Sequence, residues 1–121
     1  MKEEVSIPGL VTVEPSVLET IASLTALQVP GVAGIAESDV DRFLGISGRS
    51  VNVEVRNDKV VADLHLIAGP DVSLLQLGRQ VQYEVTRAIQ KMLGMPVEAV
   101  NIHIEDVVYP DAKVWPEDGT D

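Results

Sequence analysis

The stretch from Pro70 to Glu105, PDVSLLQLGRQVQYEVTRAIQKMLGMPVEAVNIHIE, decides the fold. Its first half predicts an amphipathic helix, capped by Asp71 or Ser73, because apolar residues and one glycine recur at helical spacing: Leu74, Leu77, Gly78, Val81, Val85, Ala88, Ile89 and Met92. Gly94 supplies the left-handed conformation that ends many helices. The alternating residues 97–108 then predict a strand with Val100, Ile102 and Ile104 directed inward. Gly78 is expected to pack closely against a strand.

A β-hairpin is predicted upstream of this helix. Residues 51–56 alternate strictly, residues 59–67 alternate again, and Asn57-Asp58 between them tolerate the positive φ of a tight turn. The apolar side chains expected to face the core are Val51, Val53, Val55, Val60, Ala62, Leu64 and Leu66. The opposite face of the hairpin then carries Asn52, Glu54, Arg56, Asp63 and His65.

The N-terminal third predicts a strand, a helix and a second strand. Residues 10–13 favour a strand through their β-branched content, and Pro15 opens a helix that ends before Pro30. The expected buried stripe of this helix is Val17, Ile21, Leu24 and Gln28, with Leu18, Ala22 and Thr25 beside it. Leu27 lies off that stripe, so it is expected to be exposed or to touch another chain. Residues 32–36 predict the second strand.

These elements predict an α/β (α+β) fold in the order β-α-β-β-β-α-β. Two helices with one apolar face each would pack on one face of a small mixed sheet, making a two-layer sandwich whose other face meets water or a partner. We expect a flexible N-terminal arm at residues 1–8, one domain at residues 9–108, and an acidic, mobile tail at residues 109–121. Trp115 in that tail is expected to dock on its own domain or on a partner.

Composition excludes several classes of function. The 121 residues suit one domain, and the absence of cysteine excludes disulfides and thiolate metal sites. A net charge of −10 disfavours binding to nucleic acid and direct docking on anionic lipid. The charged start is not a signal peptide, and no apolar run approaches the ~20 residues that span a bilayer. We therefore expect no direct membrane insertion.

The sequence carries one weak candidate for a metal site. His65 and His103 are the only histidines, and with Asp63 and Glu105 they would lie on the polar sheet face, where imidazole and carboxylate ligands suit zinc or similar ions. Two solvated histidines on a sheet surface are the favoured interpretation, because alternation alone brings such residues together. No metal or cofactor is therefore expected.

No catalytic constellation is apparent. The sequence has no G-x-S-x-G elbow and no Walker A or G-x-G-x-x-G motif, and its acids are spread over predicted surfaces. The segment Gly45–Gly48 followed by Arg49 is a G-x-x-G, which KH domains use to clamp a nucleic-acid backbone. Its position before a strand and the acidic charge favour a flexible turn instead. The protein is expected not to be an enzyme.

A series of motifs runs through residues 9–108. The most distinctive runs from Gly69 to Gln82, includes Val81-Gln82 in the helix, and continues at Val100-Asn101 in the last strand. Further motif positions are Gly9–Val13, Val17, Ile21-Ala22, Val29–Val32, Val51–Val55, Val85, Ile89, Met92–Met95, Val97, Ile102–Ile104 and Val107. The order and spacing of these motifs resemble the alkaline shock protein family, the envelope stress response proteins of mainly Gram-positive bacteria, whose helix motif VQ is matched by Val81-Gln82.

This resemblance implies a non-enzymatic interaction or scaffold protein related to envelope stress. Family members are cytosolic, and some are held at the membrane by a small membrane-anchored relative that carries the same domain. The implied behaviour is self-association into a homo-oligomer and docking to such a protein partner, with Leu27 and Trp115 as surface candidates. Because other members are linked by gene neighbourhood to fatty-acid synthesis, a small metal-binding or regulatory domain is the alternative, and a KH-like nucleic-acid binder is less favoured.

Overall fold

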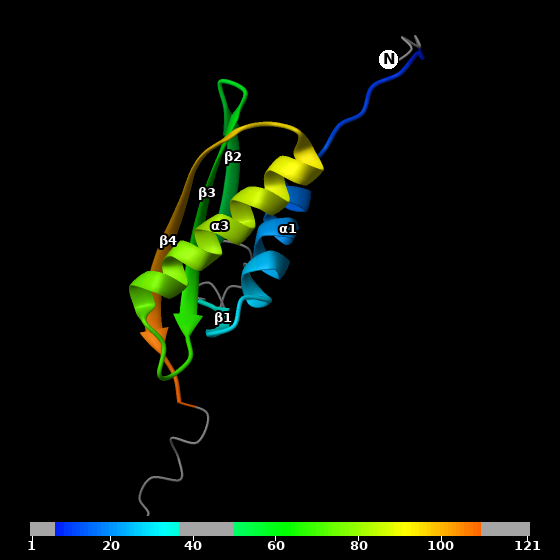
Figure 1. Cartoon of the computed structure of the whole chain (residues 1–121). Helices are drawn as coiled ribbons and strands as arrows, with labels where there is room; N and C mark the ends of the chain where they lie inside the picture. The colour runs from blue at the N-terminus through cyan, green and yellow to red at the C-terminus, as the bar shows by residue number, and fades with distance from the viewer. Residues whose placement is uncertain (1–6, 37–49, 110–121) are drawn as a thin grey trace, which may run out of the picture.

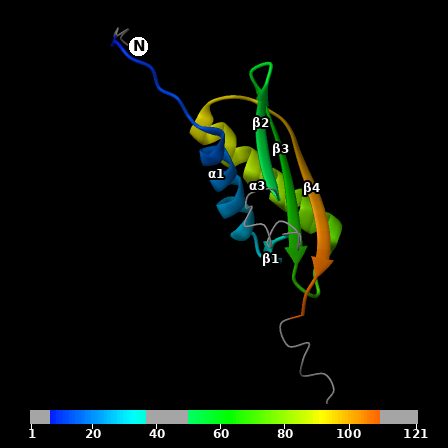
Figure 2. The ribbon, with the colours of Figure 1, turned by 180° about the vertical axis from the view of Figure 1, so that it is seen from behind.

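The computed structural model describes residues 7–36 and 50–109. Its elements are α1 (Pro15–Leu27), β1 (Val32–Ile35), β2 (Val51–Arg56), β3 (Lys59–Ala68), α3 (Leu74–Leu93) and β4 (Val97–Val107) (Figure 1). Both helices lie on one face of the sheet, and Figure 2 shows the strands from the opposite side. The predicted two-layer α+β fold is confirmed.

β3 is the central strand of a mixed sheet. β4 runs parallel to β3 and pairs with it from Val60 to Ala68, whereas β2 and β1 are both antiparallel to it. β4 pairs along the length of β3 and occupies one of its edges. The other edge of β3 is shared: β2 pairs with residues 59–64 of β3, and β1 pairs with residues 66–68. Helix α3 makes the crossover that two parallel neighbours require. In the part of the chain that the structure describes, the outer edge of β4 has no partner strand.

Local chemistry sets the turns and helix ends where the sequence predicts them. Asn57 and Asp58 have φ values of 51° and 64°, as a two-residue hairpin turn with both residues left-handed requires. Of the two predicted N-caps of α3, Ser73 occupies the position, and its hydroxyl accepts the backbone N–H of Gln76 at 3.4 Å. Gly94 ends α3 with φ 76°. These short-range predictions are confirmed.

One predicted element is absent. Residues 10–13 form no strand; Leu10 and Val11 are 94% and 95% exposed, and the segment runs away from the domain (Figure 1). β propensity reflects how well a side chain packs on a pleated surface, so β-branched residues without a partner strand do not make a strand. The observed order therefore begins with α1 and continues as predicted.

The core lies between the helices and the inner sheet face. It includes most of the apolar residues predicted for the hairpin and for α3: Val51, Val53, Val60, Ala62, Leu64, Leu66, Leu77, Val81, Val85 and Ile89. Val55, Leu74 and Met92 were expected there but are 49%, 42% and 68% exposed. Val100 is buried, and Ile102 and Ile104 pack partly buried against the core.

The predicted stripe of α1 is wrong for Val17, Leu24 and Gln28, which are exposed. Ile21 packs partly buried against the core as expected, and the buried residues are Leu18 and Ala22, which were expected beside the stripe, and Ala26. Ala22 and Ala26 are small enough for α1 to lie close to its neighbours, and this close approach selects their side of the helix. As a result, larger apolar side chains of α1 point away from the core.

Candidate interaction surfaces

The polar face of the sheet brings the two histidines together. β3 and β4 are paired in register so that His65 lies opposite His103 and Asp63 lies opposite Asn101. The two imidazole rings stack with centroids 4.5 Å apart and an interplanar angle of 13°. The predicted neighbourhood of Asp63, His65, His103 and Glu105 is therefore present, on the face that Figure 2 turns toward the viewer.

Each histidine is paired with a carboxylate from the other strand. Nδ1 of His65 hydrogen-bonds with Oε2 of Glu105, and Nε2 of His103 lies 3.7 Å from Oδ1 of Asp63. The side-chain amide of Asn101 also donates to Oδ1 of Asp63 at 3.0 Å. All of these side chains are partly exposed, so the cluster is a wet polar network on an open surface.

The arrangement differs from a metal centre. Within residues 7–36 and 50–109, no three His, Cys, Asp or Glu side chains are placed to hold a metal ion. The four residues instead form two His–carboxylate pairs. Farther along the same face, Arg56 Nε donates to Glu54 Oε1 at 2.9 Å, and this hydrogen bond raises the pKa of Arg56.

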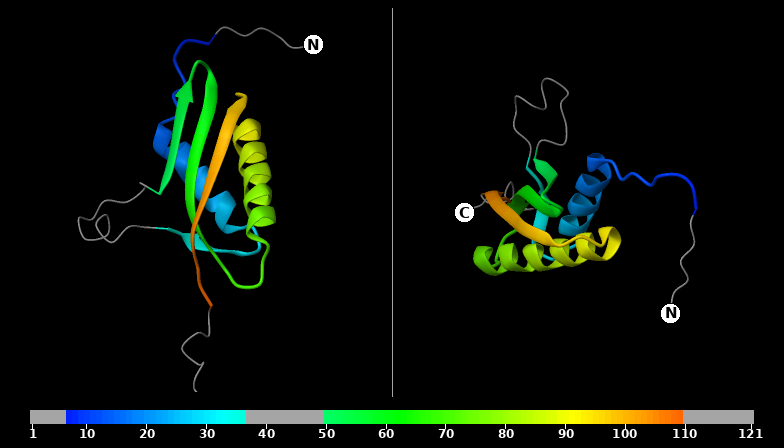
Figure 3. Two further views of the ribbon diagram at one scale, coloured as in Figure 1. Left: turned by 90° about the vertical axis from the view of Figure 1, so that its left-hand side faces the viewer. Right: turned by 90° about the horizontal axis from the view of Figure 1, so that it is seen from above.

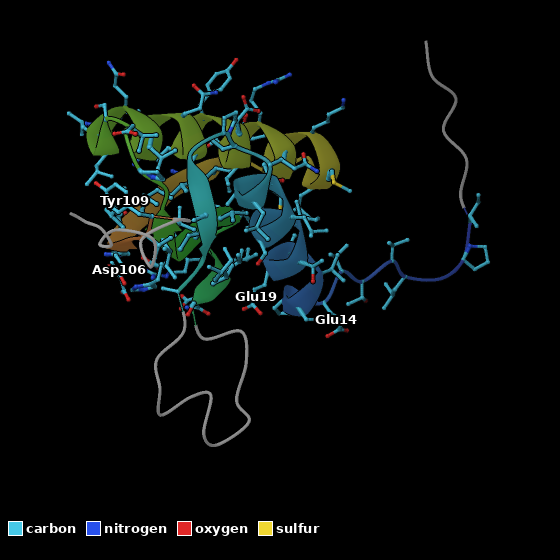
Figure 4. All side chains as sticks on the ribbon, turned by 90° about the horizontal axis from the view of Figure 1, so that it is seen from below. Glu14, Glu19, Asp106 and Tyr109 are labelled. Carbon is cyan, nitrogen blue, oxygen red and sulfur yellow. The ribbon has the colours of Figure 1, made fainter. Side chains whose placement is uncertain are left out.

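The outward side of α1 is the first apolar surface. Val17, Leu24 and Leu27 are 46%, 57% and 43% exposed, and they fall on one stripe together with Thr20; we call these four residues the outer α1 face. Exposure of Leu27 was one of the two outcomes expected for it. Glu19 is the single charged residue of the helix, and Figure 4 shows it with Glu14 on the side of α1 away from α3.

A groove between α3 and β4 is the second apolar surface, and it was not predicted from the sequence. It has a volume of ≈ 440 Å³ and is lined by Leu74, Leu75, Gly78, Arg79, Gln82, Ile102 and Ile104. Gly78 was expected to pack closely on a strand; its backbone does face Ile102, but a Cβ there would still be 3.9 Å from Ile102 Cγ2. The sequence held one signal for this groove: Leu74 and Leu75 are adjacent in a helix, so only one of them can face the core.

Gln82 is one of the residues that line this groove. Its side-chain amide donates to the backbone carbonyl of Val100 at 3.0 Å, and the contact is partly buried. A carbonyl on the free edge of β4 is thereby satisfied by α3 instead of by another strand. A smaller hollow of ≈ 260 Å³ lies between the end of α1 and α3, with Gln28, Gln80 and Glu84 among its polar lining residues.

Two of the candidates that the sequence suggested cannot be placed on these surfaces. Trp115 and the Gly45–Gly48 segment with Arg49 lie outside the described residues. In the part of the chain that the structure does describe, no helix has the length and apolar character needed to cross a bilayer.

Residues 3–109 match the family of alkaline shock protein 23, whose description is a cell envelope-related function. The chain belongs to this family. It is 28% identical to the uncharacterized protein YqhY of Bacillus subtilis over 106 residues, covering 84% of this chain and 78% of YqhY. It is 31% identical to the uncharacterized protein Spy1535 of Streptococcus pyogenes over 103 residues, covering 83% of this chain and 80% of Spy1535.

One solved structure shares the fold at low sequence identity. A single-residue variant of the MamM CTD superposes with a TM-score of 0.50 at 15% identity, covering 77% of this chain and 98% of the MamM chain. Similarity at this level shows the arrangement of helices and strands alone.

Proposed function

We propose that this protein is a non-enzymatic interaction module with an envelope-related role, acting by self-association and by docking onto a membrane-anchored or envelope protein. The observation that carries the proposal is the outer α1 face, in a chain whose family is described as cell envelope-related. The proposal includes a role in envelope stress. It also includes a cytoplasmic location, with the protein held at the membrane by its partner.

The composition of α1 supports a docking role. A surface helix normally carries charged residues opposite its buried stripe, whereas a helix that is apolar around its circumference is usually covered on both sides. α1 has a single charged residue in 13 and exposes valine and leucine side chains. Covering Leu24 and Leu27 would contribute about 1 kcal/mol each, since full burial of a leucine gives about 1.5–3 kcal/mol and each is roughly half exposed.

The ionisable groups support the non-enzymatic part of the proposal. General acid–base catalysis depends on a group held in a dry, preorganised environment. His65, His103 and the carboxylates beside them lie partly exposed on an open sheet face, and their polar contacts are to one another and to Asn101. This arrangement suits a recognition surface with donors and acceptors better than a reaction centre.

Native co-purification tests the docking role. The tagged chain is expected to retain a membrane-anchored or envelope protein, and the Leu24→Gln/Leu27→Gln variant is expected to lose it. The matched control is Tyr83→Gln/Met92→Gln, which removes two exposed apolar side chains from α3 instead and should retain the partner. Recovery of the chain alone in every case would contradict the proposed function.

A further inference from the structure

The outer edge of β4 is an edge of the sheet as the structure describes it. β4 bonds to β3 on one side, and no described strand lies on the other. The carbonyl of Val100 points to this outer side, because Gln82 binds it there. Backbone groups alternate sides along a strand, so the N–H and C=O groups of Ile102 and Ile104 face the same way. An edge of this kind is a template for another strand.

The same chain carries a strand-like segment without a sheet. Leu10-Val11-Thr12-Val13 has the β-branched composition of a strand, and in the structure it pairs with nothing that is described. It leaves the start of α1 and runs outward from the domain, as the two further views also show (Figure 3). α1 packs on β1, β2, β3 and α3, so the segment starts on the side of the domain away from β4.

The outer edge of β4 and the segment of residues 10–13 match in length and chemistry. The four residues of the arm correspond to the four residues from Ile102 to Glu105, beyond the carbonyl that Gln82 occupies. In an antiparallel pairing, Val11 lies opposite Ile104 and Val13 lies opposite Ile102. Because side chains alternate along a strand, Val11 and Val13 would then enter the apolar groove, and Leu10 and Thr12 would lie over the histidine face. Residues 7–13 are uncharged, which lets them approach a chain of net charge −10 without added repulsion.

We propose that residues 10–13 of one copy add as a strand to the outer edge of β4 in a second copy. Backbone hydrogen bonds to Ile102 and Ile104 would supply the pairing, and the groove under the edge would receive alternate side chains. This inference rests on the self-association in the proposed function and names the surface that performs it.

Sedimentation equilibrium of the full chain tests the pairing. Val11→Pro/Thr12→Pro removes the Val11 N–H that would face β4, and is expected to raise the dissociation constant about tenfold or more. The control Val11→Ile/Thr12→Val keeps both donors and should associate like the wild type. Because this segment is exposed in the monomer, all variants should have the same melting temperature at concentrations below the dissociation constant, where no variant is associated.

Designed cysteines give an independent readout, because the natural chain has none. Mixing a Val11→Cys chain with a Leu75→Cys chain under mild oxidation should give a disulfide-linked dimer. Mixing Val11→Cys with Tyr83→Cys, on another face of α3, should not. A third chain carries both Val11→Cys and Leu75→Cys. If it forms the disulfide within a monomer, residues 10–13 pair with β4 of their own copy, and the proposal is overturned.

The outcomes separate this inference from the proposed function. If the proline variant associates as tightly as the wild type, the arm is not the contact, but self-association stands. If the wild type remains monomeric at every concentration, the arm contact and self-association are both refuted, and co-purification alone then decides whether docking onto an envelope partner survives.

Discussion

Gly31 occupies a position at which a side chain would be strained and crowded. Its φ is 104°, and its carbonyl accepts the N–H of Gly69 at 2.8 Å, joining the turn after α1 to the end of β3. A Cβ on Gly31 would lie 3.1 Å from Leu77 Cδ1 and 3.2 Å from Val72 Cγ1. The turn therefore packs directly on the first part of α3.

Replacing this glycine should destabilise the protein. Gly31→Ala is expected to lower the free energy of unfolding by about 1–3 kcal/mol from backbone strain alone, measured by urea denaturation. The matched variant Gly78→Ala should change it in the opposite direction, by up to about 1 kcal/mol, because alanine favours the helix and its Cβ has room beside Ile102. Equal effects of the two variants would refute this account of Gly31.

Unlike Gly31, His65 lies on the surface, and water reaches its contacts. His65→Ala should lower the free energy of unfolding by less than about 1 kcal/mol, because an exposed pair such as His65–Glu105 contributes little. Added Zn²⁺ should shift the melting temperature of neither the wild type nor the variant. A zinc-dependent rise in the wild type that is lost in His65→Ala would restore the metal-site hypothesis.

Some of this residue-scale detail could be predicted from the sequence and some could not. Asn57, Asp58 and Gly94 were predictable because the backbone conformation they adopt is a property of the residue and its immediate neighbours. The side of α1 that is buried was not, because Ala22 and Ala26 gain their place from a close helix approach that no local pattern encodes. The histidine cluster was predictable from strand alternation, whereas its division into two pairs depends on the register of β3 and β4.

At the scale of elements, the hydrogen bond from Gln82 to Val100 links α3 to the edge of β4. Gln82→Ala should lower the free energy of unfolding by about 1 kcal/mol relative to Gln80→Ala, because it leaves a partly buried carbonyl without a donor. Gln80 is a suitable control since it makes an exposed side-chain bond to Glu84 within the helix. Equal stability of the two variants would show that water satisfies Val100 at no cost.

Element existence and element pairing were not equally predictable. Helices and the hairpin follow from periodicity, but a strand also needs a neighbouring strand. Residues 10–13 were predicted as a strand from their composition, and they form none because they join no sheet in the described structure. The α3–β4 groove could not be predicted, because it depends on where the helix axis crosses the strand. Leu74 and Leu75 showed only that more apolar side chains were present than one face can bury.

At the scale of the whole molecule, the net charge of −10 opposes the approach of two copies. Salt screens this repulsion over distances beyond the Debye length, which is about 8 Å at physiological ionic strength. Self-association is therefore expected to tighten as NaCl is raised from low to physiological concentration, measured by sedimentation equilibrium. Weakening with salt would indicate that ion pairs, rather than apolar and backbone contacts, hold the copies together.

The measurement that tests the central claim most directly is the comparison of the outer α1 face with two exposed apolar side chains of α3, Tyr83 and Met92. Tagged wild-type protein, Leu24→Gln/Leu27→Gln and Tyr83→Gln/Met92→Gln are each purified from native membrane and soluble fractions, with melting temperatures recorded for all three. We predict that the wild type and the α3 variant retain the same envelope protein and that the α1 variant, equally stable, loses it. Retention of that protein by all three, or by none, would contradict the claim.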